Sequence, residues 1–504
     1  MLKAGSTCWR VEPAPRVAML VDMAPYLDAA RAAMAAATRS IHFLNWAFDP
    51  DTVLQHEPDG PGSDPLTIGA FLQSLAEARP GLDIRILCWQ SALPVAATQR
   101  FFPLRSRGFF ARSRIDFRLD GTLPLGASHH QKVLVVDDVL AFVGSCDIGP
   151  DRWDTPEHRH PDPRRAKRPG GDPCYDCRHE VMALVDGAPA ASLGALFRER
   201  WERATGQTLP APQAGAKTAW PAHVDPDLTD ATVGISRTQA PWKSHEERRE
   251  GEAATLAAIA SARRSLYLEN QYFTSPIVAE ALAERLEEPD GPDVVLVSTQ
   301  HSPSWFDQIT MDRTRSAFLR RLETSDLHGR LHAYSPVTAS GETIIVHAKL
   351  AIVDDRYIRL GSSNMNNRSE GFDTECDLTI DAASANDGQG GACVAVFRDR
   401  LVAHWLGCDE GRVRDEVKAQ GGLGRAIEAL RRNGLDRLRP LHSEPLGRFA
   451  TLVASFHLGD PVSAHDSLRP WKRRAVTRLK LSQARRRLAE ARLPAPDPAA
   501  TTRI

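Results

Sequence analysis

Two short runs of this chain combine histidine, lysine and aspartate at one spacing, H-x-K-x4-D. The residues are His130, Lys132 and Asp137 in the first run, and His347, Lys349 and Asp354 in the second. Side chains alternate between the two faces of a strand, so the histidine and lysine of each run project from the same face. An imidazole beside a fixed ammonium group suits an anionic phosphate ester better than a neutral substrate. These residues therefore predict a site for an anionic phosphate ester.

The surroundings of the two runs are also alike. Apolar, largely β-branched residues follow each lysine (133–136 and 350–353), which predicts a buried strand. Ser145 and Ser362 each lie fifteen positions after the histidine of their run. Chance duplication of the whole pattern is improbable, so the two runs predict an internal repeat.

Composition places the chain among soluble globular proteins and excludes some partners. It has 504 residues, 42% hydrophobic and 25% charged, which suggests two or three domains. The net charge of -1 gives no electrostatic case for nucleic acid, so we expect no nucleic-acid partner. Eight cysteines without a zinc-type pattern are read as reduced thiols.

No secretory signal and no membrane span is evident in the sequence. We therefore expect a cytoplasmic or peripheral membrane protein, and export by a route without a cleavable signal stays open. A protein of this kind reaches a lipid substrate from solution.

Helical and strand patterns alternate along the chain and then recur in the same order. In the first half, residues 24–38 and 66–78 predict helices, and residues 39–48 and 83–89 predict strands. In the second half, the corresponding helices are 250–264 and 276–287, and the corresponding strands are 265–273 and 293–299. Equivalent landmarks lie more than 200 positions apart, too long a period for a solenoid. The predicted fold class is α/β, with sheets covered by helices.

The same patterns divide the chain into four parts. We predict a first half at 1–207, a linker rich in proline and alanine at 208–230, a second half at 231–410, and a basic helical extension with a disordered end at 411–504. The basic run 469–487 could lie on an anionic membrane surface, and packing on the core is an equal alternative.

Three further segments carry a family resemblance: Asp-Arg-Trp-Asp-Thr-Pro-Glu-His at 151–158, Tyr-Leu-Glu-Asn-Gln-Tyr-Phe at 267–273, and Phe-Arg-Glu-Arg-Trp at 197–201. With the paired runs, they resemble the phospholipase D superfamily, and phospholipase D proper most closely, over roughly residues 15 to 405. The resemblance implies two similar α/β/α halves related by a pseudo-twofold axis, with the active site at their interface.

The resemblance also implies a role for each site residue. His130 is assigned as a nucleophile that forms a phosphohistidine, and His347 as the general acid and later the base; the reverse order stays open. Lys132 and Lys349 bind the non-bridging oxygens, so the reaction is expected to need no metal ion or cofactor. Ser145, Ser362 and Asn364 are expected to complete the substrate-binding site. In the first motif, the position that corresponds to Asn364 is occupied by Asp147, a carboxylate in place of an amide.

Carboxylates are expected behind the two imidazoles, where they fix the tautomers. Glu375 is assigned to His347 and Asp176 to His130. Asp137 and Asp354 are counted with the catalytic motif, although they lie too far along the strand to touch their own histidine and are expected to cap the following turn. Residues 269–271 are expected near the site.

The predicted function is hydrolysis of the distal phosphodiester of glycerophospholipids to phosphatidate and free head group, with transphosphatidylation as a side reaction. The alternatives are phosphatidyl transfer of the cardiolipin synthase type and a catalytically silent lipid-binding protein; a nuclease is disfavoured. We expect a monomer with a glycerophospholipid substrate and a peripheral contact with an anionic membrane. The head-group preference does not follow from the sequence.

Overall fold

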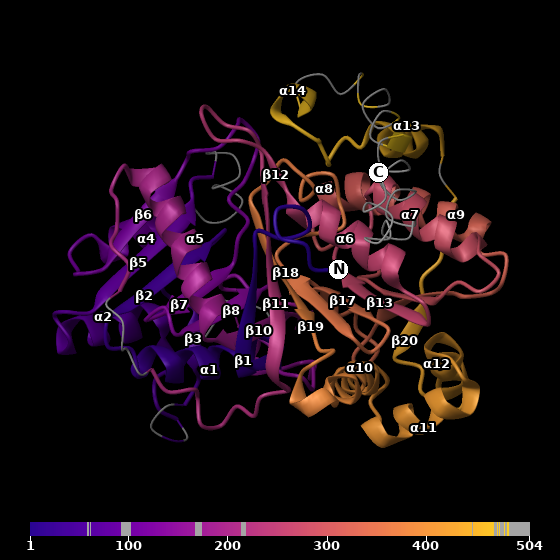
Figure 1. The fold of residues 1–504 in the computed structure, drawn as a ribbon, viewed down its shortest axis with the longest axis horizontal. Coiled ribbons are helices and arrows are strands. Elements are labelled where there is room, and N and C mark those ends of the chain that lie inside the picture. The colour runs from indigo at the N-terminus through magenta and orange to yellow at the C-terminus, as the bar shows by residue number, and fades with distance from the viewer. Residues whose placement is uncertain are drawn as a thin grey trace, which may run out of the picture.

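One continuous sheet crosses the molecule and contains sixteen strands among the described residues (Figure 1). The structure is a computed structural model, which describes residues 1–57, 60, 62–91, 102–166, 174–212, 218–445, 447–467, 471, 473, 478 and 481–482. The central pair is β1 (Arg10–Val21) and β11 (Leu228–Gln239), which run antiparallel with Val17 opposite Leu228.

The two sides of the sheet have the same strand order when they are read outward from the central pair. From β1 the order is β10 (Val181–Asp186), β8 (Leu140–Gly144), β7 (Val133–Val136), β2 (Ser40–Asn45), β5 (Asp83–Trp89) and β6 (Asp116–Asp120). From β11 it is β19 (Glu375–Asp381), β18 (Tyr357–Gly361), β17 (Lys349–Val353), β13 (Ser265–Asn270), β14 (Asp293–Val297), β15 (Leu331–Pro336) and β20 (Leu438–Pro440).

The strand directions repeat as well. β2 is antiparallel to β7 and parallel to β5, and β13 is antiparallel to β17 and parallel to β14. The short strand β12 (Arg248–Arg249) pairs with β11, and two small sheets join β3 (Val53–Gln55) to β4 (Leu66–Thr67) and β9 (Arg178–His179) to β16 (Ile345–Val346). The predicted α/β class is confirmed, and the repeated order is consistent with the predicted pseudo-twofold relation.

Helices cover both faces of the sheet. Those of the first side are α1 (Met23–Ala35), α2 (Ile68–Ala78), α4 (Phe102–Phe110) and α5 (Ala188–Thr205), with the turn η1 (Pro163–Arg165). Those of the second are α6 (Glu250–Ser261), α7 (Pro276–Glu287), α8 (Trp305–Asp307), η2 (Gln308–Asp312), α9 (Arg313–Ser325) and α10 (Gly390–Leu406), with the turn η3 (Asn386–Gly388). Four more follow: α11 (Glu410–Gln420), α12 (Leu423–Arg432), α13 (Arg448–Phe456) and α14 (Ala464–Ser467).

Alternation along the strands feeds separate cores on the two faces. Val133 and Val135 of β7 join a core shared by both sides, which α5 and α10 cover. Leu134 and Val136 face the opposite way, into a core with α1 and α2. A third core lies between the second side of the sheet and α6, α7 and α9. The shared core is the apolar link that holds the two sides in one body.

Local sequence signals account for several element boundaries. α7 begins where Ser275 Oγ accepts a hydrogen bond from Val278 N at 3.2 Å and Pro276 takes the first helical position. β5 has the bounds that the sequence pattern predicts, and β2 and β13 each fall inside a predicted strand. Near neighbours along the chain decide such boundaries, which is why they can be read from sequence.

The predicted division into domains stays a prediction, and its boundaries can be compared with the observed helices and strands. β11 begins at Leu228, inside the range predicted for the linker. α11 packs against α10 and α12, and β20 extends the main sheet from residues assigned to the extension. Most of the basic run 469–487 lies outside the described residues. No helix in the described part of the chain combines the length and apolarity that crossing a membrane requires.

Candidate functional site

Both motif histidines lie where the two sides of the sheet exchange backbone hydrogen bonds. His130 N donates to Thr374 O at 3.0 Å, and His347 N donates to His179 O at 2.8 Å. Each histidine is thus attached to a segment from the other side of the molecule. The repeated strand order places a histidine and a lysine at equivalent positions on both sides of the sheet, and the junction between the sides brings these two motifs together.

Each imidazole contacts a buried glutamate of the opposite side. His130 Nδ1 lies 2.8 Å from Glu375 Oε2, and His347 Nδ1 lies 2.8 Å from Glu180 Oε2. A carboxylate that accepts the Nδ1 proton leaves Nε2 with the lone pair in the neutral ring. Both histidines are therefore oriented to use Nε2 for chemistry.

The predicted pairing of carboxylates with histidines is wrong. Glu375 contacts His130 and not His347, and Asp176 is exposed, whereas Glu180 was not predicted. The error has a physical cause: each glutamate follows the segment that hydrogen-bonds with the opposite histidine, so the pairs cross between the halves. A signal was available, because Glu180 directly precedes β10 and Glu375 begins β19, and each of these strands pairs with the strand that ends before the serine of its half.

The two serines lie behind the histidines. Ser362 Oγ donates to Glu375 Oε2 at 2.6 Å, and Ser145 Oγ donates to Val181 O at 3.2 Å; both side chains are fully buried. Their predicted role in direct substrate binding is therefore wrong, because their hydroxyls are already engaged with the carboxylate or the backbone. Asn364 is 9% exposed, and its Oδ1 accepts no hydrogen bond within the described residues, so substrate binding stays its predicted role.

The two lysines are buried and have unequal partners. Lys132 Nζ donates to His130 O at 2.9 Å and lies 3.2 Å from Asp147 Oδ2. Lys349 Nζ donates to His347 O and reaches the neutral Gln271 Oε1 at 3.5 Å. Asp147 also accepts hydrogen bonds from the backbone N–H groups of residues 46 and 47. It thereby ties Lys132 to the sheet, and Lys349 has the less neutralised charge.

Burial and the nearby lysine and arginine side chains favour neutral imidazoles in the free site. Burial lowers the pKa of His130 well below its usual value, and the charges of Lys132 and Lys349 lower it further. Burial, then Lys349, Arg152 and Arg178, and finally Lys132, do the same to the pKa of His347. The lysine of the other motif lowers the pKa of each histidine, in agreement with the backbone hydrogen bonds that join the two sides at this place.

The pKa values of Lys349 and of the two glutamates are also shifted toward the neutral forms. Burial lowers the pKa of Lys349 to about 7, with Lys132 and Arg152 adding to the effect and Glu180 opposing it. Burial raises the pKa of Glu375 and of Glu180. Burial and neighbouring charges favour the neutral forms of these groups in the free site. A bound anion would stabilise the charged forms of the nearby lysines and histidines.

Two arginines that the sequence analysis did not assign to the site stand beside His347. Arg152 Nη1 lies 3.8 Å from Glu180 Oε1, and Arg178 Nε donates to Asp151 O at 3.2 Å. Arg152 belongs to the segment 151–158, which was singled out only for its family resemblance. Charge in that segment was the available signal, because a guanidinium is well suited to bind a phosphate group.

The motif aspartates hold strands and do not reach the site. Asp137 accepts hydrogen bonds from the backbone N–H groups of residues 38, 39 and 40 at 2.7–2.8 Å, and Asp354 accepts from those of residues 263, 264 and 265 at 2.6–2.9 Å. Counting them as catalytic is therefore wrong. The expected cap of the following turn is wrong as well, because the backbone donors belong to a distant part of the chain. Each fixes the start of the strand next to its motif strand.

Residues 269–271 have three different surroundings. Glu269 is fully buried against His179 and Tyr267, and Asn270 Oδ1 accepts from the backbone N–H groups of residues 272 and 365. Gln271, through Lys349, is the member of the three that contacts a motif side chain among the described residues. The structure therefore brings one of these polar residues to the site directly and uses the other two as support.

Comparison with known proteins gives matches both to a family model and to curated relatives. A family model described as "Cardiolipin synthase, PLD-like domain" matches residues 255–388. Phospholipase D alpha 4 of Arabidopsis thaliana is 23% identical over 462 residues, covering 70% of this chain and 60% of that protein. Cardiolipin synthase A of Pseudomonas putida is 26% identical over 331 residues, covering 62% of this chain and 57% of that protein.

Among solved structures, the phosphatidylserine synthase of Haemophilus influenzae Rd KW20 has a similar fold. It matches with a TM-score of 0.54 at 14% sequence identity and covers 93% of this chain and 96% of that one. The sheet order and the crossed histidine–glutamate pairs define a duplicated α/β protein with one composite site. The resemblance to the phospholipase D superfamily is confirmed by the sequence matches. The chain spans 60% or less of the length of these curated relatives.

Proposed function

We propose that this protein is a phospholipase D-type phosphodiesterase, which hydrolyses the distal phosphodiester of glycerophospholipids to phosphatidate and a free head group. The observation that carries the proposal is the crossed arrangement of two imidazoles, each with Nδ1 on a buried glutamate, in a site with two buried lysines. Two histidines can divide the nucleophile and proton-donor roles of one phosphoryl transfer.

In the first half-reaction, His130 Nε2 attacks phosphorus, and the bond from phosphorus to the head-group oxygen breaks. His347 Nε2 gives its proton to that oxygen, which leaves as an alcohol. The incoming phosphodiester anion raises the pKa of His347 toward its usual range, while the neighbouring arginines keep it a ready proton donor. The reverse assignment of the two histidines remains the alternative.

In the second half-reaction, neutral His347 takes a proton from water, the oxygen of that water attacks phosphorus, and the bond from His130 Nε2 to phosphorus breaks. Lys132 and Lys349 stabilise the charge on the non-bridging oxygens in both steps. An alcohol can replace water as the acceptor, which gives transphosphatidylation. Phosphatidyl transfer of the cardiolipin synthase type is the second candidate, and the match of 255–388 to the cardiolipin synthase model favours it specifically.

One assay separates these functions. The purified full chain is incubated with vesicles of phosphatidylcholine and phosphatidylglycerol, with and without ethanol. We expect phosphatidate without ethanol and phosphatidylethanol with it. Cardiolipin as the main product supports the transferase, and vesicles left unchanged while the protein still binds them support a silent lipid-binding protein. Either of the last two results overturns the hydrolase proposal.

We propose further that the site faces an anionic membrane surface through Trp305 and Phe306 of α8. Their exposed fractions are 72% and 55%, and the next residue, Asp307, accepts a hydrogen bond from Tyr272 OH at 3.1 Å. Gln271 joins Tyr272 to Lys349 by contacts of 3.1 and 3.5 Å, so the aromatic pair is close to the site. Tryptophan and phenylalanine at a rim suit the boundary between head groups and acyl chains.

The double substitution W305A/F306A is expected to lower the rate on phospholipid vesicles about tenfold, because most of the buried apolar area at the interface is lost. The rate on a short-chain phospholipid below its micellar concentration should stay unchanged. Leu327→Ala, at a residue 67% exposed, is the control for loss of any surface apolar group. Equal loss on both substrates, or no loss on vesicles, contradicts this orientation.

A further inference from the structure

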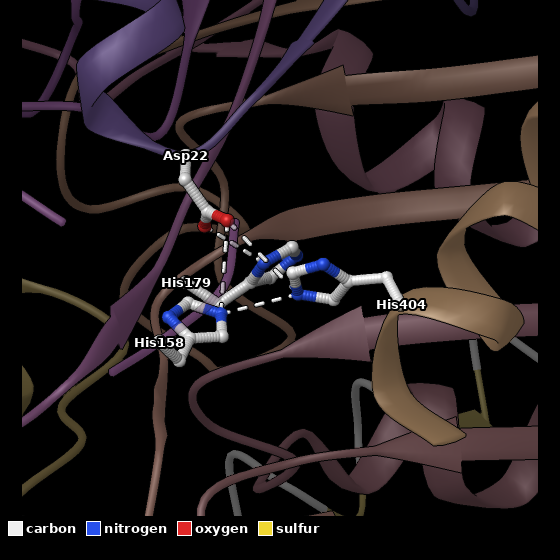
Figure 2. A group of neighbouring side chains, drawn as sticks. All are labelled: Asp22, His158, His179 and His404. Carbon is white, nitrogen blue, oxygen red and sulfur yellow. Dashed lines mark hydrogen bonds and ion pairs between the residues drawn. The ribbon is translucent and has the colours of Figure 1, made fainter. Parts of the chain in front are cut away.

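A second cluster of histidines lies buried directly behind the site. Asp22 follows β1, His158 follows β8, and His404 belongs to α10, so the three residues come from distant parts of the chain. Figure 2 shows the Asp22 carboxylate and the imidazoles pointing toward one another, with His179 beside them. Trp405 packs against these rings and encloses the cluster.

We propose that His158 Nε2, His404 Nε2 and Asp22 Oδ2 bind one divalent transition-metal ion, with zinc as the expected ion. The two nitrogens are 3.1 Å apart, and they lie 3.6 and 4.0 Å from the oxygen. Ligands about 2.0–2.1 Å from a tetrahedral zinc are about 3.3 Å from each other, so small side-chain shifts suffice. Water can take the fourth position.

The carboxylate itself points to a missing cation. Asp22 is fully buried, and its Oδ1 accepts a hydrogen bond from Glu180 N at 3.1 Å and pairs with His179 Nδ1 at 3.0 Å. Its Oδ2 receives no hydrogen bond within the described residues and faces the two Nε2 atoms. A buried carboxylate oxygen without a donor costs free energy, and a bound cation removes that cost.

The outer contacts prepare the ligands for a metal. His158 Nδ1 lies 2.8 Å from Asp154 Oδ2, which fixes the tautomer with the lone pair on Nε2. This carboxylate–histidine pair has the form of the outer shell around many zinc sites. Without a metal, His404 Nε2–H would donate to His158 Nε2, and Asp22 Oδ2 would keep no hydrogen bond. The metal-free arrangement therefore satisfies two of the three atoms, and the metal satisfies all of them.

The ion would join the halves without entering the reaction. His158 lies in the first half and His404 in the second, and Asp22 holds the backbone of Glu180, the residue that orients His347. The expected role is structural: it fixes the support of one catalytic pair. The two-histidine reaction proposed above needs no ion at phosphorus.

The test measures metal in the tag-free full chain by elemental analysis after expression with added zinc and gel filtration. We expect about one zinc per wild-type chain and per His328→Gln chain, since His328 is exposed. His158→Gln and His404→Gln should each retain less than about a fifth of that amount. Less than a fifth in the wild-type protein, after reconstitution with ZnCl₂ as well, overturns the proposal, as does full zinc content in both variants.

A second measurement guards against variants that do not fold. Wild-type protein stripped with a chelator should show a Tm several degrees lower, and ZnCl₂ but not MgCl₂ should restore it, because an ion that binds only the folded state stabilises it. Reconstitution with Co²⁺ should give the intense visible absorption of a four-coordinate site. No change in Tm, with a Co²⁺ spectrum like that of the hydrated ion, overturns the proposal without any variant.

Discussion

Replacement of either His130 or His347 by alanine is expected to lower kcat on phospholipid vesicles at least about 10⁴-fold. The reason is that the two imidazoles do different jobs: one forms and breaks the bond to phosphorus, and the other moves the proton to and from the departing or arriving oxygen. Neither lysine can take over, because a lysine whose charge stabilises the phosphoryl oxygens is a protonated donor without a lone pair.

The measurement is a steady-state assay with both single variants and with His328→Ala, an exposed histidine outside the site. Thermal unfolding should show that the variants fold, since the backbone hydrogen bonds of His130 to Thr374 and of His347 to His179 do not depend on the side chains. A decrease of only a few-fold for either variant, with the fold intact, contradicts a two-histidine mechanism.

The sequence predicts the elements far better than it predicts the contacts between them. β5 has the bounds expected from pattern alone, because β-branched residues and flanking turns decide a strand locally. The repeat of the motifs likewise predicts two matching sets of strands. The Asp137 contacts are not local, because its carboxylate accepts hydrogen bonds from the backbone N–H groups at the start of β2, far away in the sequence.

The crossed pairs show where that reasoning ends. Glu375 was assigned to the histidine of its own half because the two are close in sequence, yet it lies on His130. The segment before Glu375 hydrogen-bonds with the segment that leads to His130, and no residue type or spacing encodes that long-range register. Glu180 was missed for the same reason, since its partner His347 lies on the far side of the junction. Arg152 was missed with it, because Arg152 reaches the site beside Glu180.

The crossing has a kinetic consequence that tests both the pairing and the roles. Glu375→Gln and Glu180→Gln should each lower kcat about 10²- to 10⁴-fold, because the charge that stabilises one imidazolium is lost. A substrate whose leaving group needs no proton, such as a p-nitrophenyl phosphodiester, removes the need for the general acid in the first half-reaction. Its burst of p-nitrophenol then reports only on the nucleophile.

With that substrate, the burst rate should return to within about tenfold of wild type in His347→Ala and in Glu180→Gln, since both act on the proton donor. His130→Ala should give no burst, and the burst in Glu375→Gln should remain slow. Asp176→Asn is the matched control: it should behave as wild type, since Asp176 is exposed. Rescue of Glu375→Gln together with His347→Ala would restore the pairing within each half and refute the crossed one. Rescue of His130→Ala and Glu375→Gln in place of the other two would keep the crossing but exchange the roles of the histidines.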